Sequence, residues 1–213
     1  LFLKKINNLR IMMYIRKAEK KDVYDCVPLI YSAGVPLFDY IYRHEQITAE
    51  HFIHKEFLSE YGYTSYNLHW VVEDQGKVIA VVACYATKDL SRMDNGTIKN
   101  ILKMYKFRFP RVLMRALNSS SVVTKPSETS LHVANFGVHP NYRSQGIGTQ
   151  LLQHLKMHAI EQGYSGLSLD VSKANPKGQS LYERIGFKVV EETAFKDENT
   201  QRMPNGRRME WYF

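Results

Sequence analysis

The chain has 213 residues, of which 44% are hydrophobic and 23% charged, so it has the composition of a soluble globular protein that can bury a core. Its formal net charge of +8 favours an anionic partner, such as a polyphosphate ligand, a nucleic acid or an acidic membrane surface. The composition excludes a disulfide framework, because Cys26 and Cys84 are the only cysteines.

The N-terminal segment and the apolar runs limit the class of protein further. Leu1–Leu9 lacks the continuous apolar stretch of a signal peptide, and no apolar run reaches the ~18 residues that a membrane span needs. The histidines show neither an HExxH motif nor clustered spacing, so no metal site is expected. We therefore predict a cytoplasmic protein in which residues 1–12 are an extension and residues 13–213 form one domain.

In the N-terminal half, the pattern predicts a short strand followed by helices and then a hairpin. Alternation favours a strand at Tyr14–Ala18, and apolar residues at 3/4 spacing predict an amphipathic helix at Lys20–Ala33. Helical spacing continues over Leu37–Tyr61. Leu68–Glu73 and Val78–Ala86 are rich in β-branched and aromatic residues around a short glycine-containing turn, which predicts a β-hairpin.

Residues 88–128 are predicted to be a helical insertion between two strands. Two helices are expected, at Gly96–Tyr105 and Arg108–Leu117. Their apolar stripes are Ile98, Ile101, Leu102 and Tyr105 in the first and Val112, Leu113, Ala116 and Leu117 in the second. Six basic residues and no acidic one lie from Lys99 to Arg115. Because the stripes explain the helices, we interpret the charges as a solvated face; a nucleic-acid or acidic-membrane surface is the alternative.

The C-terminal half predicts strands and helices in alternation. The strands are expected at Ser130–Val138, Leu167–Val171, Phe187–Glu192 and Met209–Phe213, and the helices at Gly148–Gln162 and Pro176–Ile185. A strand–helix–strand unit implies a parallel pair joined by a right-handed crossover. Since hairpins are expected at both ends, the sheet is predicted to be mixed.

The loop from Arg143 to Thr149 has the features of an anion site. A strand ends before it, and a helix begins where Gly146 and Gly148 stand. Helix N-termini attract anions, and glycines let a phosphate approach the backbone. Arg143 adds a positive charge and Thr149 a hydroxyl. The segment matches neither GxGxxG nor GxxxxGK[ST], and taken alone it is also compatible with a plain turn into a helix.

Two segments resemble motifs of one family. Val138–Gly148, which reads VHPNYRSQGIG, resembles the acetyl-CoA signature of the GNAT (Gcn5-related) N-acetyltransferases. Asn175–Phe187, which reads NPKGQSLYERIGF, is similar to that family's second motif, and the close resemblance covers about Ser130–Glu192. It implies a GNAT-like α/β fold of the α+β type. This fold is a mostly antiparallel, twisted sheet of about seven strands with a central parallel pair and flanking helices.

The resemblance implies how acetyl-CoA, the co-substrate, lies on the chain. Its pantetheine arm would pair with the strand that ends at Val138, and its pyrophosphate would lie on the loop from Arg143 to Thr149. Asn175 would contact the pantetheine or phosphate region, and Tyr182 would stand near the sulfur. The implied cofactor-binding residues are Phe136, Gly137, Val138, Arg143, Ser144, Gln145, Gly146, Ile147, Gly148, Thr149, Asn175 and Tyr182.

The implied reaction is direct attack of a small-molecule or protein amine on the thioester. By resemblance, the backbone N–H of Val138 stabilises the oxyanion and Tyr182 protonates the leaving thiolate. His132 is a candidate base, because it stands where the histone-modifying branch of the family has a glutamate. Glu73, Asp170 and a water relay are alternatives.

Two further functions stay open at this point. The chain could be a non-catalytic acyl-CoA-binding module that retains the fold, or a nucleic-acid-binding protein that uses the basic insertion. The nucleic-acid-binding function is the less favoured of the two, and no membrane partner is expected. The oligomeric states left open include a homodimer.

Overall fold

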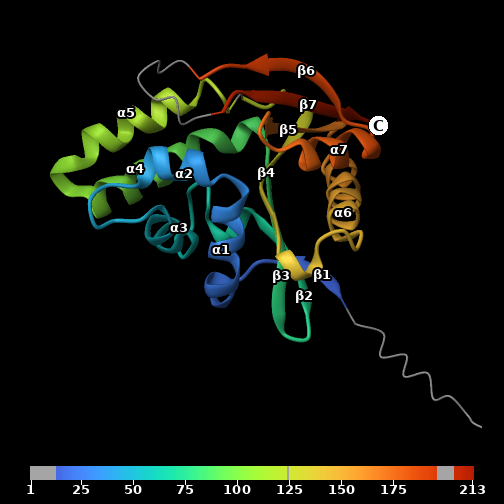
Figure 1. Cartoon of the computed structure of the whole chain (residues 1–213), viewed down its shortest axis with the longest axis horizontal. Coiled ribbons are helices and arrows are strands. Elements are labelled where there is room, and N and C mark those ends of the chain that lie inside the picture. The colour runs from blue at the N-terminus through green and yellow to red at the C-terminus, as the bar shows by residue number, and fades with distance from the viewer. Residues whose placement is uncertain (1–12, 124, 196–203) are drawn as a thin grey trace, which may run out of the picture.

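The computed structural model describes residues 13–123, 125–195 and 204–213; the predicted extension at 1–12 lies outside the described residues. Within them, one seven-stranded sheet has the order β1-β2-β3-β4-β5-β7-β6 (Figure 1). The strands are β1 (Tyr14–Lys17), β2 (His69–Asp74), β3 (Lys77–Tyr85), β4 (Ser130–Val138), β5 (Gly166–Ser172), β6 (Lys188–Thr193) and β7 (Gly206–Tyr212).

The sheet is mixed, as the sequence predicts. Its neighbouring strands are antiparallel except for β4 and β5, which are parallel. The fold class is therefore confirmed. The last strand differs from the prediction, since β7 begins at Gly206 rather than Met209 and so includes Arg207 and Arg208. The start of the strand was hidden from sequence analysis, because its first two buried positions are occupied by Gly206 and Arg208 rather than by apolar residues.

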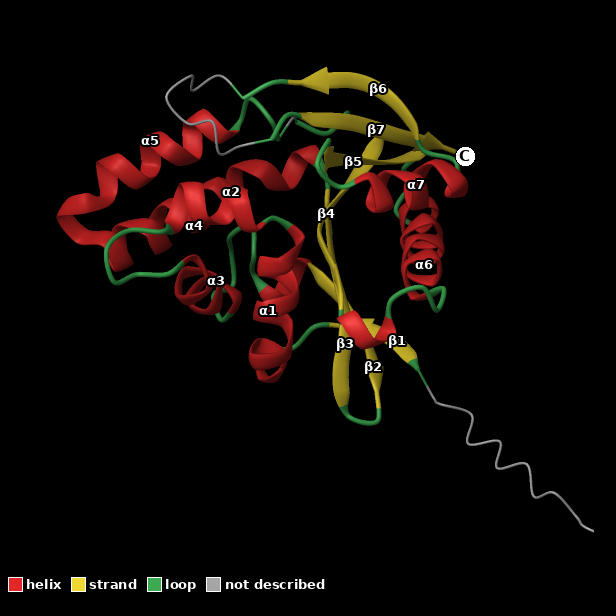
Figure 2. Cartoon of the chain, viewed as in Figure 1, coloured by secondary structure: helices red, strands yellow, loops and turns green. Residues whose placement is uncertain are grey.

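Helices cover both faces of the sheet (Figure 2). One face carries α1 (Val23–Ala33), α2 (Val35–Tyr42), α3 (Ala49–Phe57), α4 (Leu90–Tyr105) and α5 (Phe109–Ser119), and the other carries α6 (Ile147–Glu161) and α7 (Pro176–Ile185). Strand alternation divides the core accordingly: Val71 and Val81 belong to one buried cluster, while Val72 and Val82 belong to the other. No helix in the described part of the chain has the length and apolar character for a bilayer crossing.

The helices α4 and α5 occupy the predicted insertion between β3 and β4. Their inner faces bury Ile101, Tyr105 and Val112. The predicted apolar stripes are nevertheless wrong in part, because Leu102 is 52% exposed and Leu117 is 64% exposed. Each apolar stripe is wider than the side of its helix that packs against the rest of the protein, so part of each stripe faces solvent.

A buried carboxylate ties this helical layer together. Glu56 of α3 has no exposed surface. Its Oε2 accepts hydrogen bonds from the backbone N–H of Thr64 at 3.0 Å and the Thr64 hydroxyl at 2.8 Å, and its Oε1 accepts from the Thr97 hydroxyl of α4 at 2.7 Å. Burial raises the pKa of Glu56 above its ordinary value, although these donors oppose the shift.

Candidate active site

The middle of β4 contains a β-bulge. In the register with β3, Val81 faces Gly137 and Ala83 faces Ala134, so two residues of β4 oppose one residue of β3. Asn135, inside the bulge, has a φ of 51°, and its side-chain amide donates to the Tyr63 carbonyl at 2.9 Å. The bulge is therefore pinned to the segment that precedes β2, and it bends β4 where the strand passes its parallel neighbour.

Beyond this point, β4 and β5 separate (Figure 2). Their pairing runs only from Ser130 with Gly166 to Val133 with Leu169, although β4 continues to Val138. The second half of β4 therefore has β3 as a partner on one edge and, among the described strands, none on the other. Such an edge can pair with an extended ligand by backbone hydrogen bonds.

The backbone groups of Val138 lie on this open edge. The N–H of His139 donates to the Ile79 carbonyl of β3 at 2.8 Å, and successive residues of a strand point their backbone groups to opposite sides. Consistent with this, the Val138 carbonyl accepts from Nε of Arg143 at 3.0 Å rather than from β3. The N–H of Val138 is thus directed to the side from which β5 has withdrawn.

The loop that follows leads into the N-terminus of α6. Ser144 and Gly146 have φ values of 61° and 82°, and the stretch from Arg143 to Gly146 is exposed. The first turn of α6 has no side-chain cap, and its first backbone hydrogen bond runs from Gln150 to the Gly146 carbonyl at 3.0 Å. The N–H groups of the residues between them, including Gly148, are therefore available to an anion.

The two glycines of this loop have different roles. A Cβ atom at Gly146 would meet nothing within 4 Å, so the space beside it is open. A Cβ at Gly148 would lie 3.0 Å from Leu181 and 3.5 Å from Phe136, so this glycine lets α6 approach α7 and β4. Of the other predicted loop residues, Gln145 donates to the Asn141 carbonyl at 3.0 Å.

Tyr182 of α7 lies beside the same junction. Its ring centroid is 6.3 Å from that of Phe136 and 5.8 Å from that of Phe187, and the residue is 9% exposed. No hydrogen-bond partner for its hydroxyl is found within the described ranges. Burial raises the pKa of Tyr182 to about 12, so the phenol is protonated at neutral pH. The structure thus brings Tyr182 and Phe136 next to the start of α6.

Asn175 has a structural role at the start of α7. Its side-chain oxygen accepts from the N–H of Gly178 at 3.0 Å and caps the helix. A Cβ at Gly178 would lie 2.5 Å from the Asn175 amide nitrogen, so a larger residue there would displace the capping side chain. Asn175 is an exposed residue, so its side-chain amide can still donate to a ligand.

The candidate base His132 belongs to a buried polar cluster on the face of the sheet opposite to that of Tyr182. Its Nδ1 lies 3.3 Å from the Ser168 hydroxyl and 3.3 Å from Nη1 of Arg208, and its Nε2 lies 3.6 Å from the Asp170 carboxylate. Burial, and then the charge of Arg208, lower the pKa of His132 to about 3. The imidazole is therefore neutral at physiological pH.

Sequence reasoning missed Arg208, which is 3% exposed and lies within 3.3 Å of Asp170. It fell just outside the strand that we predicted. Glu73, another candidate base, lies on β2 and pairs with Arg16 at 2.7 Å, two strands away from β4. The cluster of His132, Asp170 and Arg208 therefore lies nearer than Glu73 to the point where β4 and β5 part.

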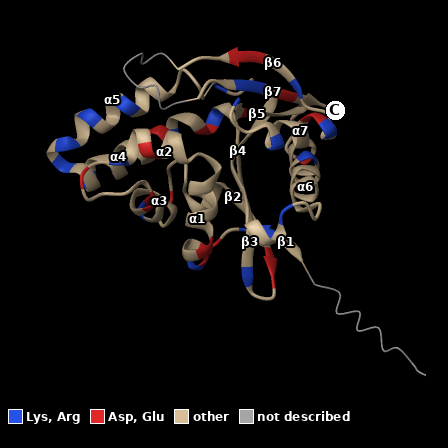
Figure 3. Cartoon of the chain, viewed as in Figure 1, with Lys and Arg blue, Asp and Glu red and all other residues tan. Residues whose placement is uncertain are grey.

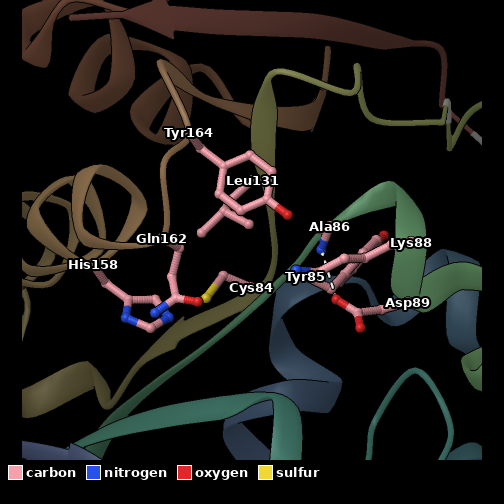
Figure 4. Close-up of a pocket in the computed structure, with 9 residues that line it drawn as sticks. All are labelled: Cys84, Tyr85, Ala86, Lys88, Asp89, Leu131, His158, Gln162 and Tyr164. Atoms are coloured by element: carbon pink, nitrogen blue, oxygen red, sulfur yellow. Dashed lines mark hydrogen bonds between the residues drawn. The ribbon is translucent and has the colours of Figure 1, made fainter.

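A separate hollow of about 100 Å³ lies at the far end of α6 (Figure 4). It is lined by His158 of α6 and by Gln162, the C-cap of that helix, together with Cys84 and Leu131. The 15 residues of α6 place it roughly 20 Å from the loop that runs from Arg143 to Thr149. Burial raises the pKa of the Cys84 thiol, so this cysteine is protonated and not an activated nucleophile. No group of three or more metal-ligating side chains is found among the described residues.

Two relatives are similar in sequence. The ribosomal protein bS18-alanine N-acetyltransferase of Escherichia coli (strain K12) is 40% identical over 53 residues, which cover 25% of this chain and 36% of that protein. The human N-acetyltransferase 8B is 25% identical over 143 residues, which cover 67% of this chain and 46% of that protein. The chain thus spans less than half the length of either relative.

Solved structures share the fold. An N-acetyltransferase from Staphylococcus aureus Mu50 aligns with a TM-score of 0.65 and 17% identity over 92% of this chain and 99% of that chain. The ribosomal-protein-S18-alanine N-acetyltransferase from Escherichia coli aligns with a TM-score of 0.52 and 17% identity over 94% of each chain. A family model matches residues 38–187, more than half of the sequence. The chain therefore belongs to the Acetyltransferase (GNAT) family.

Proposed function

We propose that the chain is an N-acyltransferase that moves the acetyl group of acetyl-CoA to a primary amine of a small-molecule or protein acceptor. One observation carries this proposal: the open edge of β4 ends at Val138, and the uncapped N-terminus of α6 follows within the same loop. A strand edge next to an anion site suits a ligand with an extended amide arm and a pyrophosphate. Membership of the family supports the same choice.

The residues of the donor site divide between two tasks. The backbone of Phe136, Gly137 and Val138 would pair with the pantetheine arm. The pyrophosphate would be held by Arg143 and by the backbone N–H groups at the start of α6. The residues of that part are Ser144, Gln145, Gly146, Ile147, Gly148 and Thr149. Asn175 would add its free amide nitrogen.

Two groups would act on the thioester. The N–H of Val138, on the open edge, would donate to the oxyanion that forms when the amine attacks. Tyr182 would donate to the thiolate that leaves; its raised pKa keeps the phenol protonated, which is the state that a donor needs. The hydroxyl is free for this task within the described chain, while the ring of Tyr182 is fixed by its aromatic neighbours.

The route proposed for the amine proton does not use His132 as the base that takes this proton directly. A base whose protonated form has a pKa of about 3 accepts a proton only weakly at neutral pH, so the direct role predicted for His132 is disfavoured. We propose that the acceptor reacts as the neutral amine and that water carries its proton away, past the cluster of His132 and Asp170. The free, buried Cys26 and Cys84 are consistent with the reducing cytoplasm that we propose as its location.

The test is a coenzyme A release assay on the whole chain with acetyl-CoA and a panel of amines. Because relatives differ in acceptor, the panel includes a peptide with an N-terminal alanine, a lysine peptide and a polyamine. Turnover with at least one amine, strongly reduced in Tyr182→Phe, is the expected result. Tight binding of acetyl-CoA without turnover of any amine would support the non-catalytic binding module instead.

A further inference from the structure

The corner between α4 and α5 is rich in Lys and Arg, which Figure 3 colours blue, and it also exposes large apolar side chains. Phe107 is 78% exposed, Met114 is 58% exposed and Leu117 is 64% exposed. Lys103, Lys106 and Arg111 accompany them. We call these six residues the corner surface. Single exposed apolar residues are ordinary, but several on one surface mark an interaction site.

Helical spacing places the three members of the corner surface that belong to α5 on one side of that helix. Arg111, Met114 and Leu117 recur every three residues along α5, and all are outside the core. The opposite side of this helix is the packed one, since Val112 is fully buried. Figure 1 shows α5 at the periphery of the molecule. The apolar residues of the outer side therefore lie outside the buried core.

The local structure holds Phe107 outward. Lys106, the C-cap of α4, has a φ of 50° and a ψ of −120°, a strained conformation that costs on the order of 1 kcal/mol for a residue other than glycine. The Arg108 guanidinium lies 4.7 Å from the centroid of the Phe107 ring and also pairs with Glu45 at 2.6 Å. The exposed ring is thus part of an ordered corner rather than of a frayed end.

The charges of the corner surface are not used within the described chain. Lys103, Lys106 and Arg111 form no ion pair with any described residue, whereas Arg108 has Glu45. From Lys99 to Arg115 the sequence has no acidic residue. The surface therefore combines uncompensated positive charge with apolar area.

We propose that the corner surface binds an anionic lipid surface, with Phe107, Met114 and Leu117 inserted at the level of the headgroups and the cations against the phosphates. Charge complementarity selects an anionic partner, and the apolar residues select lipid over nucleic acid. A nucleic acid would neutralise Lys103, Lys106 and Arg111 but would leave Met114 and Leu117 without a partner. The contact is peripheral and does not depend on the acyl transfer reaction.

Sedimentation with vesicles tests the proposal on the whole chain. One set of vesicles contains phosphatidylcholine alone, and the other contains equal amounts of phosphatidylcholine and phosphatidylglycerol. Binding is expected only to the second set and is expected to weaken as salt is raised. The double variant Lys106→Gln/Arg111→Gln should bind at least about tenfold more weakly, and Phe107→Ser/Met114→Gln should also lose about tenfold or more.

Matched controls lie away from the corner. Lys77→Gln removes an exposed cation at the β2–β3 turn, and Met157→Gln replaces a methionine that is 55% exposed on α6. Both should bind as the unchanged chain does, and circular dichroism should show that every variant folds. Equal binding to both sets of vesicles would overturn the proposal. So would binding to duplex DNA without binding to vesicles, or a loss in the charge variant alone.

Discussion

A Cβ atom built on Gly137 of β4 would lie 2.3 Å from the carbonyl oxygen of Leu29 in α1. The α1 backbone therefore rests directly on the strand that carries Val138. The second half of β4 lacks β5 as a neighbour. The contact with α1 holds it in place from the face of the sheet opposite to α6. The glycine that the motif places before Val138 thus serves packing as well as any contact with a ligand.

Gly137→Ala is expected to push α1 away from β4, because backbone atoms cannot yield as a flexible side chain does. We expect the free energy of unfolding to fall by about 2 kcal/mol or more. Urea denaturation followed by circular dichroism measures the loss. A loss below about 0.5 kcal/mol, the size of an ordinary surface substitution, would show that α1 shifts freely.

Gly146 and Gly163 provide a matched pair. They have φ values of 82° and 80°, and a Cβ at either meets nothing within 4 Å. Alanine at either position should therefore cost about 1 kcal/mol of stability through its strained backbone. Only Gly146→Ala places a methyl group at the uncapped start of α6, so only it should raise the Kd for acetyl-CoA, by roughly tenfold. Calorimetric titration of both variants separates the two effects, and equal affinities would remove the loop from the donor site.

Tyr182→Phe is expected to lower kcat by about a hundredfold while the Kd for acetyl-CoA and the thermal midpoint stay nearly constant. The reason is that the hydroxyl has no partner in the described chain, whereas the ring is held between Phe136 and Phe187. Steady-state kinetics and calorimetry provide both readouts. An unchanged kcat would exclude Tyr182 as the proton donor.

Sequence reasoning predicted the loop and its partner motif because both depend on local signals. The anion loop was visible in its glycines and its arginine, and the strand–helix alternation around it gave the sheet. The bulge at Asn135 was not predictable, because it depends on a hydrogen bond to Tyr63 and on the register with β3. Arg208 was missed for a related reason. An arginine is expected at an exposed position, and its burial follows only from the position of Asp170, which is distant in sequence.

The pH dependence of kcat/KM tests the state of His132. Since burial lowers its pKa to about 3, the imidazole stays neutral from about pH 5 to about pH 9, a range that includes its ordinary pKa near 6.5. The rate should therefore rise with pH as the acceptor amine loses its proton, without a separate inflection near pH 6.5. An inflection there that disappears in His132→Gln would restore His132 as the general base.

The buried Glu56 should contribute more to the stability of the folded protein at acidic pH than at neutral pH. Its pKa in the folded state is raised above its ordinary value of 4.5, so the folded chain keeps this proton after the unfolded chain has lost it. Between these two pKa values the unfolded state binds fewer protons, and the free energy of unfolding falls as the pH rises.

The comparison with Glu56→Gln isolates this effect, because the amide does not titrate and the other carboxyl groups are common to both proteins. The stability of the unchanged chain relative to the variant should decline from pH 4.5 upward, by at most about 1.4 kcal/mol for each pH unit, and should level off above the folded pKa. Urea denaturation across this range measures the difference. A difference that increases with pH would mean that the hydrogen bonds from Thr64 and Thr97 outweigh the cost of burial and that the folded pKa is lowered instead.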